Sequence, residues 1–134
     1  MTNAMELHLI IPPAPSVNAM YFTTKFGKRV RTKKAKEWFA QAEAITRQAI
    51  KEQGWVKTEG QKVIVEVLTM WQDNRRRDTN NLSKSLADML EHAGVYDDDT
   101  YALVRFIDYG VDKSNPRVEM TIYPFTEKDK WKGE

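Results

Sequence analysis

The segment from Val63 to Thr69 limits the folds open to this chain more than any other part of it. It is a run of β-branched and aliphatic residues in which only Glu66 is charged. β-Branched side chains favour strands, and a run that is apolar at both odd and even positions indicates a strand covered on both faces. We therefore predict that this segment is a central strand of a sheet.

Two helices are expected, one on each side of this strand in the sequence. Apolar residues recur at helical spacing over residues 33–53 and again over residues 79–93. Thr32 is suited to cap the start of the first helix, and Gly54 and Gly94 are suited to end the two helices.

The remaining segments predict further strands and one long loop. Residues 5–11 alternate apolar and polar side chains, as a half-buried strand does. Residues 12–27 are rich in Pro, Ser, Asn and Gly, which indicates a loop. Residues 102–109 and 117–123 alternate again, and the turn-forming residues between them predict a hairpin.

The order strand, loop, helix, strand, helix, strand, strand predicts an α+β fold with a mixed sheet. A length of 134 residues, with 41% hydrophobic and 30% charged residues, fits one domain over residues 1–134 with a frayed tail at 125–134. No Cys is present, so no disulfide partner is expected. No membrane-spanning or signal pattern is apparent, and we expect a cytoplasmic protein without a membrane partner.

Positive charge is concentrated near the N-terminal end. Residues 1–36 contain seven Lys or Arg and one acid, Glu6, whereas residues 37–134 contain 14 basic and 18 acidic residues. The seven basic residues form one run: Lys25, Lys28, Arg29, Arg31, Lys33, Lys34 and Lys36. Such a run attracts phosphate groups, and the alternative is a solvated loop that leads into the first helix.

Polar side chains gather in residues 73–84, between the central strand and the second helix. This segment holds three arginines, two acids, three asparagines and one lysine, and a further acidic run follows at residues 97–99. If the two neighbouring strands pair, Asp78 and Asp99 are expected to approach each other at one edge of the sheet. A cluster of carboxylates there would suit Mg²⁺, which prefers oxygen ligands.

The chemistry that fits such a site is phosphodiester hydrolysis, in which a bound metal activates water and stabilises the departing 3′ oxygen. Lys84, one turn into the helix, is placed to neutralise charge that builds on the phosphate in the transition state. Guanidinium groups suit the flanking backbone phosphates, and three are adjacent here: Arg75, Arg76 and Arg77.

The same residues also have structural interpretations. Asp78 or Thr79 can cap the second helix, because both residue types satisfy free amide groups there. The three arginines can pair with neighbouring aspartates, and residues 97–99 can form a solvated turn. Lys84 can pair with Asp88, four residues later, on the helix surface.

The motifs Arg75-Arg-Arg-Asp-Thr-Asn-Asn-Leu-Ser-Lys84 and Val95-Tyr-Asp-Asp-Asp99 occur together with an opening Pro13-Ala-Pro-Ser-Val-Asn18, Tyr21 and a basic turn. In combination they resemble the RusA family of Holliday junction resolvases. That family has an Asp-x-Asp-Asn-x-x-Lys run, then a helix and an Asp-Asp pair. The resemblance covers most of the chain, from about residue 7 to residue 123.

The resemblance implies a homodimeric, Mg²⁺-dependent endonuclease, with Mn²⁺ as a substitute, that nicks opposed strands of four-way DNA junctions in recombination and repair, as in bacteria and prophages. It implies that Asp78 is a metal ligand, Lys84 the catalytic lysine and Asp99 the last essential aspartate. The residues expected to contact branched DNA are Asn18, Lys28, Arg29, Arg31, Lys33, Arg75, Arg76 and Arg77.

One position departs from the family pattern. Asn80 replaces the second aspartate, so the implied metal set of Asp78, Asn80, Asp98 and Asp99 lacks one negative charge. Asp97 is an extra acid beside the pair. Two functions therefore stay open: a junction resolvase, or a junction- or duplex-binding protein of the same fold with impaired catalysis. A structural RNA-binding protein would explain the basic run but not the spacing of the lysine and the aspartates.

Overall fold

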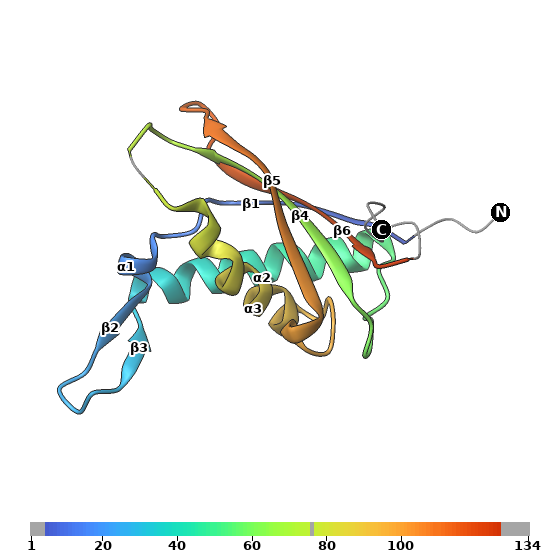
Figure 1. Cartoon of the computed structure of the whole chain (residues 1–134), viewed down its shortest axis with the longest axis horizontal. Coiled ribbons are helices and arrows are strands. Elements are labelled where there is room, and N and C mark those ends of the chain that lie inside the picture. The colour runs from blue at the N-terminus through green and yellow to red at the C-terminus, as the bar shows by residue number, and fades with distance from the viewer. Residues whose placement is uncertain (1–4, 76, 127–134) are drawn as a thin grey trace, which may run out of the picture.

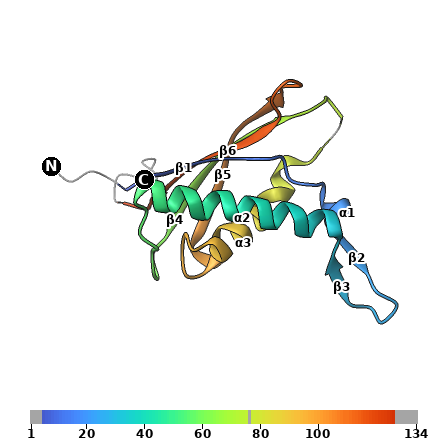
Figure 2. The same ribbon diagram turned by 180° about the vertical axis from the view of Figure 1, so that it is seen from behind.

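A computed structural model describes residues 5–75 and 77–126 of the chain, apart from the side chains of Val17 and Asn18. The main sheet has four strands, β1 (Leu7–Ile11), β4 (Val63–Trp71), β5 (Ala102–Val111) and β6 (Arg117–Pro124). Two long helices, α2 (Lys33–Gln53) and α3 (Ser83–Ala93), lie on one face of this sheet (Figures 1 and 2). The predicted α+β fold with a mixed sheet and two main helices is confirmed.

β4 is a central strand, as its sequence predicts. The strand order is β1-β6-β4-β5, so β4 pairs with β6 on one side and with β5 on the other. The pairing with β6 is antiparallel and the pairing with β5 is parallel. The first strand alternates buried and exposed side chains over Leu7–Ile11, which confirms that it is half-buried.

The expected hairpin between residues 102–109 and 117–123 is wrong, because β4 lies between β5 and β6. After β4, helix α3 returns the chain to the start of that strand, so that Ala102 is opposite Val63. A strand–helix–strand unit of this kind closes as a parallel pair. The chain then crosses the end of β4, where the Asp112 N–H donates to the Trp71 carbonyl at 2.8 Å.

The β4–β5 pair contains a bulge that changes which face β5 presents. Val67 is opposite Phe106 but Leu68 is opposite Asp108, so Ile107 is an inserted residue. An inserted residue reverses the alternation of side chains that follow it. Tyr109 therefore lies opposite the buried Thr69 and faces the side of the sheet that carries the helices.

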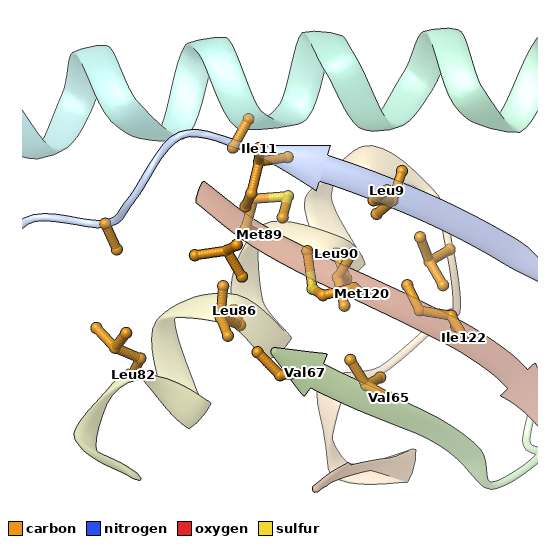
Figure 3. Close-up of a cluster of buried hydrophobic side chains, with 14 of the residues drawn as sticks. Leu9, Ile11, Val65, Val67, Leu82, Leu86, Met89, Leu90, Met120 and Ile122 are labelled. Carbon is orange, nitrogen blue, oxygen red and sulfur yellow. The ribbon is translucent and has the colours of Figure 1, made fainter. Parts of the chain in front are cut away.

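The core lies between this face of the sheet and the two helices. β-Strand side chains such as Val65 and Ile122 pack against Leu86 and Met89 of α3, and Trp38 of α2 belongs to the same cluster. Figure 3 shows the strand side chains directed toward those of α3. Full burial of each such side chain contributes about 1.5–3 kcal/mol, so the helix that follows the polar segment is firmly held on the sheet.

The helix boundaries follow the expected signals. Thr32 caps α2 by accepting a hydrogen bond from the Ala35 N–H at 3.2 Å. Gly54 and Gly94 follow the two helices with φ angles of 72° and 95°, in the left-handed region that favours glycine. The expected second helix is in two parts, because η1 (Thr79–Leu82), a 3₁₀-helix, precedes α3.

The loop expected over residues 12–27 is partly wrong, because it contains a short helix and half of a hairpin. α1 (Val17–Met20) is capped by Ser16, and β2 (Tyr21–Thr23) then pairs with β3 (Arg29–Arg31). This basic hairpin extends away from the sheet (Figure 1). Three-residue strands are too short to show an alternating pattern, which is why the sequence did not indicate them.

Within the described residues, no helix is both long and apolar enough to cross a bilayer. Phe125, at the start of the expected tail, donates its N–H to the Lys62 carbonyl at 2.8 Å and is therefore tied to the sheet. Residues 127–134 of that tail lie outside the described residues.

Candidate active site

The polar segment after β4 is fixed by Arg77. Its guanidinium binds the Asp73 carboxylate at 2.8 Å and lies over the Trp71 ring, 4.6 Å from the ring centre. A third contact, at 3.0 Å, goes to the Asp73 carbonyl. The pKa of Asp73 is lowered, first by a hydrogen bond from the Arg75 N–H and then by Arg77. Arg77 thus holds the loop that leads to Asp78, as the structural interpretation of the arginines expected.

Asp78 and Asn80 line a surface cavity between this loop and the bulged part of β5. The cavity is formed by residues 77–80 and 106–109. Asp78 occupies the position before η1 but makes no side-chain capping bond, so its carboxylate is not used as a cap. Asp108 lies on the opposite wall. The sequence reasoning missed this carboxylate, whose only signal is that Asp108 is the one acid of β5.

Lys84 and Asp99 line a second cavity, between the first turns of α3 and the start of β5. Its other lining residues are Ser83, Ala87, Ala102 and Val104. Lys84 is exposed, and its expected partner Asp88 binds Arg31 and His92 instead. An ammonium group and a carboxylate that line one cavity can hold a phosphate and a cation respectively.

Glu91, Asp98 and Asp99 form an acidic cluster beside this second cavity. Each offers a carboxylate oxygen, and these oxygens lie within 4.8 Å of one another. Glu91 also accepts a hydrogen bond from the Asp99 N–H at 2.7 Å. Hydrogen bonds from Thr100 lower the pKa of Asp98. Carboxylate oxygens at this spacing fit the oxygen ligands that Mg²⁺ takes.

Glu91 was not among the residues predicted from the sequence, although a signal for it was present. It follows Lys84 by seven residues, which places both on the same face of α3. Asp97, considered as an extra acid, points elsewhere, because its carboxylate accepts a hydrogen bond from the Gly60 N–H at 3.1 Å.

Strand pairing does not bring Asp78 and Asp99 together, and that expectation is corrected. β5 runs parallel to β4, so Asp99 precedes the end of β5 that lies beside the start of β4, whereas Asp78 follows the end of β4. Instead, the two residues line neighbouring cavities along β5. Val104 belongs to one cavity and Phe106, two residues later on the same strand, belongs to the other.

Tyr96, the residue before the acidic run 97–99, is anchored in the core. Its side chain is fully buried and its hydroxyl donates to the Ala87 carbonyl in α3 at 2.6 Å. Burial raises the pKa of Tyr96, and the negative charges of Asp99 and Glu91 raise it further. The phenol therefore keeps its proton and ties the acidic run to the helix that carries Lys84.

The residues expected to bind DNA have different surroundings. Lys28, Arg29, Lys33 and Arg75 are exposed. Arg31 is half-buried, since its guanidinium binds Asp88 and lies 3.7 Å from the centre of the Phe39 ring. Two further predicted contacts, Arg76 and the side chain of Asn18, lie outside the described residues.

Comparison with known proteins gives one family. The sequence model described as Endodeoxyribonuclease RusA matches residues 11–123, most of the chain. No curated protein matches the chain at a significant level. The matched range contains both cavities, the acidic cluster and the basic hairpin.

Proposed function

Because the chain belongs to the RusA family of endodeoxyribonucleases, we propose that it is a Mg²⁺-dependent resolvase that cuts four-way DNA junctions by paired phosphodiester hydrolysis. The observation that carries the proposal is the placement of Lys84 and Asp99 in one cavity, beside the acidic cluster. We place this activity in DNA recombination and repair, in the cytoplasm of a bacterial or phage-infected cell.

The acidic cluster is proposed as the metal site. Asp98 and Asp99 provide two of the predicted ligands, and Glu91 adds a third carboxylate within reach. Bound there, Mg²⁺ would supply Lewis-acid activation of water and neutralisation of phosphate charge, and Mn²⁺ would substitute for it. Asp78 and Asn80, the other two predicted ligands, are proposed to hold a second cation in the neighbouring cavity.

Lys84 is proposed to hold the scissile phosphate. It lies in the first turn of α3, lines the same cavity as Asp99 and is exposed to solvent. Its ammonium group would neutralise the charge that develops on the phosphoryl oxygens. The exposed Arg75 and the basic residues Lys28, Arg29 and Lys33 are proposed to bind flanking phosphates, which makes binding strongly salt-dependent.

A homodimer is part of the proposal, because two copies related by a twofold axis would meet two equivalent strands of the junction. β5 is an edge strand of the sheet. Two of its apolar side chains are exposed to solvent, Leu103 by 36% and Ile107 by 61%. Exposed apolar side chains beside an open strand edge suit contact with a second copy. Substitution Ile107→Lys is therefore expected to shift the mass measured by sedimentation toward the monomer.

Asn80 supports one other candidate, a junction-binding protein of the same fold with weak or no cleavage. The amide keeps an oxygen in the cavity of Asp78 but contributes no negative charge. A cation would be held less strongly there than between carboxylates.

The two candidates are distinguished by incubating the purified chain with a labelled four-way junction or its linear duplex, in Mg²⁺, Mn²⁺ or EDTA. The resolvase proposal expects paired nicks in the junction alone, lost with EDTA. It also expects losses of at least roughly 100-fold in cleavage rate for Asp99→Asn and Lys84→Ala. Glu59→Gln, an exposed acid outside both cavities, is the matched control and should cleave normally.

Binding measured in EDTA completes the test. Tight junction binding without nicks by the wild type favours the impaired binder. Absence of junction binding at low salt contradicts both candidates. Thermal unfolding curves should first show that the wild type and Lys84→Ala are both folded. Equal cleavage by the two proteins would then show that the lysine has no catalytic role.

A further inference from the structure

The tip of the basic hairpin carries an aromatic side chain that the protein leaves in solvent. Phe26 is 85% exposed, the largest fraction among the exposed hydrophobic residues described, and Phe22 on the same hairpin is 52% exposed. A large apolar side chain isolated from the core gains nothing from folding. It is suited to a contact that forms only on binding.

The backbone holds Phe26 at the apex of a defined turn. Thr24 and Lys28 pair, with the Thr24 N–H donating to the Lys28 carbonyl at 2.8 Å. The Gly27 N–H donates to the Thr24 carbonyl at 2.9 Å, and Gly27 has a φ of 80°. This is the three-residue hairpin loop in which a type I turn precedes a left-handed glycine. The apex therefore has a defined backbone conformation, and the side chain of Phe26 extends from it into solvent.

Positive charge surrounds this aromatic tip. Lys25, Lys28 and Arg29 are exposed on the hairpin, and the Lys25 ammonium lies 5.3 Å from the centre of the Phe26 ring. No acidic residue occurs between Glu6 and Glu37 in the sequence. An aromatic ring flanked only by cations suits a ligand that offers flat apolar faces between negative charges, which describes nucleobases between phosphates.

The hairpin is anchored at its base and free at its tip. Arg31 binds Asp88 on α3 at one end of β3, whereas the turn projects away from the sheet (Figure 2). The tip is thus held at a fixed position relative to the helix that carries Lys84, but at a distance from the two cavities. Such an element contacts DNA away from the scissile phosphate.

We propose that Phe26 stacks on a base exposed at the branch point of the junction, while Lys25, Lys28 and Arg29 bind the adjacent phosphates. This inference rests on the proposed function and adds to it the feature that distinguishes a junction from a duplex. In a duplex every base is stacked between neighbours, whereas strand exchange at a branch point interrupts stacking. Aromatic insertion is least costly where stacking is already interrupted.

The test uses the full chain in EDTA, with four-way junctions that carry 2-aminopurine either beside the branch point or within an arm. The wild type should change the fluorescence of the branch-point probe and leave the arm probe unchanged. Phe26→Ala should abolish that change and weaken junction binding by roughly 10-fold, a loss typical of one stacking contact, with duplex binding kept within about twofold. Phe26→Trp should restore both signals.

Ile10→Ala is the matched control, because Ile10 is a 61% exposed apolar residue on β1 and lies outside the hairpin. It should behave as the wild type. An unchanged branch-point signal and junction affinity in Phe26→Ala would overturn the inference. A Phe26→Ala protein that loses dimer mass in sedimentation but keeps the probe signal would also overturn it, and would make the tip a contact between copies.

Cleavage by the wild type in Mg²⁺ distinguishes a wrong role for Phe26 from a wrong proposed function. If the wild type nicks the junction and Phe26→Ala gives the same probe signal, only the role of the tip is wrong. If the wild type neither binds nor nicks the junction, the proposed function is wrong and the inference falls with it.

Discussion

Arg31 on β3 binds Asp88 on α3, and this ion pair joins the base of the basic hairpin to the helix that carries Lys84. The side chains of both partners are less than one-third exposed, and the Arg31 guanidinium also covers the Phe39 ring. The DNA contact expected for Arg31 stays a prediction, and in the structure its guanidinium is paired with Asp88. The pair ties the hairpin to α3, on which Lys84 lies.

Substitution Asp88→Ala is therefore expected to destabilise the protein. It leaves a partly buried guanidinium without its carboxylate, which we expect to cost about 1 kcal/mol, more than an exposed pair would. Urea denaturation measures this difference. Glu6→Ala is the control, because the Glu6–His8 pair is exposed and its loss should change the free energy of unfolding by less than about 0.5 kcal/mol. Equal effects of the two substitutions would contradict the anchoring role.

Arg75 and Arg77 are expected to behave differently although they are two residues apart. Arg77→Ala removes the contacts to Asp73 and the Trp71 ring, and should lower the free energy of unfolding by about 1–2 kcal/mol. Arg75→Ala, at an exposed side chain, should leave stability unchanged and reduce the slope of log affinity against log salt concentration by about one. Thermal unfolding and salt titrations of junction binding measure these two effects. A stable Arg77→Ala protein would show that this arginine does not hold the loop.

Tyr96 is expected to make stability depend on alkaline pH. Burial raises its pKa above the ordinary value of 10.0, with Asp99 and Glu91 adding to the effect. Below pH 10 the folded and unfolded chains both keep this proton. Above it only the unfolded chain releases the proton, so the free energy of unfolding falls by about 1.4 kcal/mol for each pH unit.

Tyr96→Phe should remove this alkaline decline and cost about 1 kcal/mol at neutral pH, since the bond to the Ala87 carbonyl is lost. Denaturation curves from pH 8 to pH 11 measure both. Tyr109→Phe, on a tyrosine that is 67% exposed, is the control and should keep the decline. An identical decline in Tyr96→Phe would contradict the assignment.

Asn80→Asp is expected to increase cleavage, because it adds a negative charge to the cavity shared by Asp78 and Asp108. A cation in that cavity would be bound more tightly, and we expect the Mg²⁺ concentration for half-maximal cleavage to fall roughly tenfold, or by about 1.4 kcal/mol. A Mg²⁺ titration of the cleavage rate measures it. Asn74→Asp, at an exposed asparagine of the preceding loop, is the control. A rate unchanged by Asn80→Asp would show that the charge at this position does not limit catalysis.

Features encoded by neighbouring residues were predictable from the sequence. The apolar run of β4 indicated its central place, and Thr32, Gly54 and Gly94 marked the helix ends where the structure has them. The partners of β5 were not predictable from its own alternation, because an alternating strand can pair with any strand of matching polarity. The parallel pairing depends on the return of the chain through α3, which is a tertiary property.

In the candidate site, too, some residues could be predicted from the sequence and others depend on the tertiary structure. Lys84 and Asp99 were predicted from the polar segments and the family resemblance, and the structure places both in one cavity. Glu91 could have been added to them, because it lies on the same face of α3 as Lys84. Asp108 could not, because the bulge at Ile107 breaks the alternation from which the faces of Asp108 and Tyr109 would be predicted. A bulge shifts side chains from one face to the other without a distinct composition.

The pairing of β1 with β6 has a consequence for how the protein folds during synthesis. His8 lies opposite Thr121, 113 positions later in the sequence. Until the ribosome has released β6, neither β1 nor β4 has its antiparallel partner, and both strands present open edges. Pairing over such sequence separations forms slowly and leaves unpaired strands prone to aggregation. The native sheet therefore assembles only after β6 has been translated.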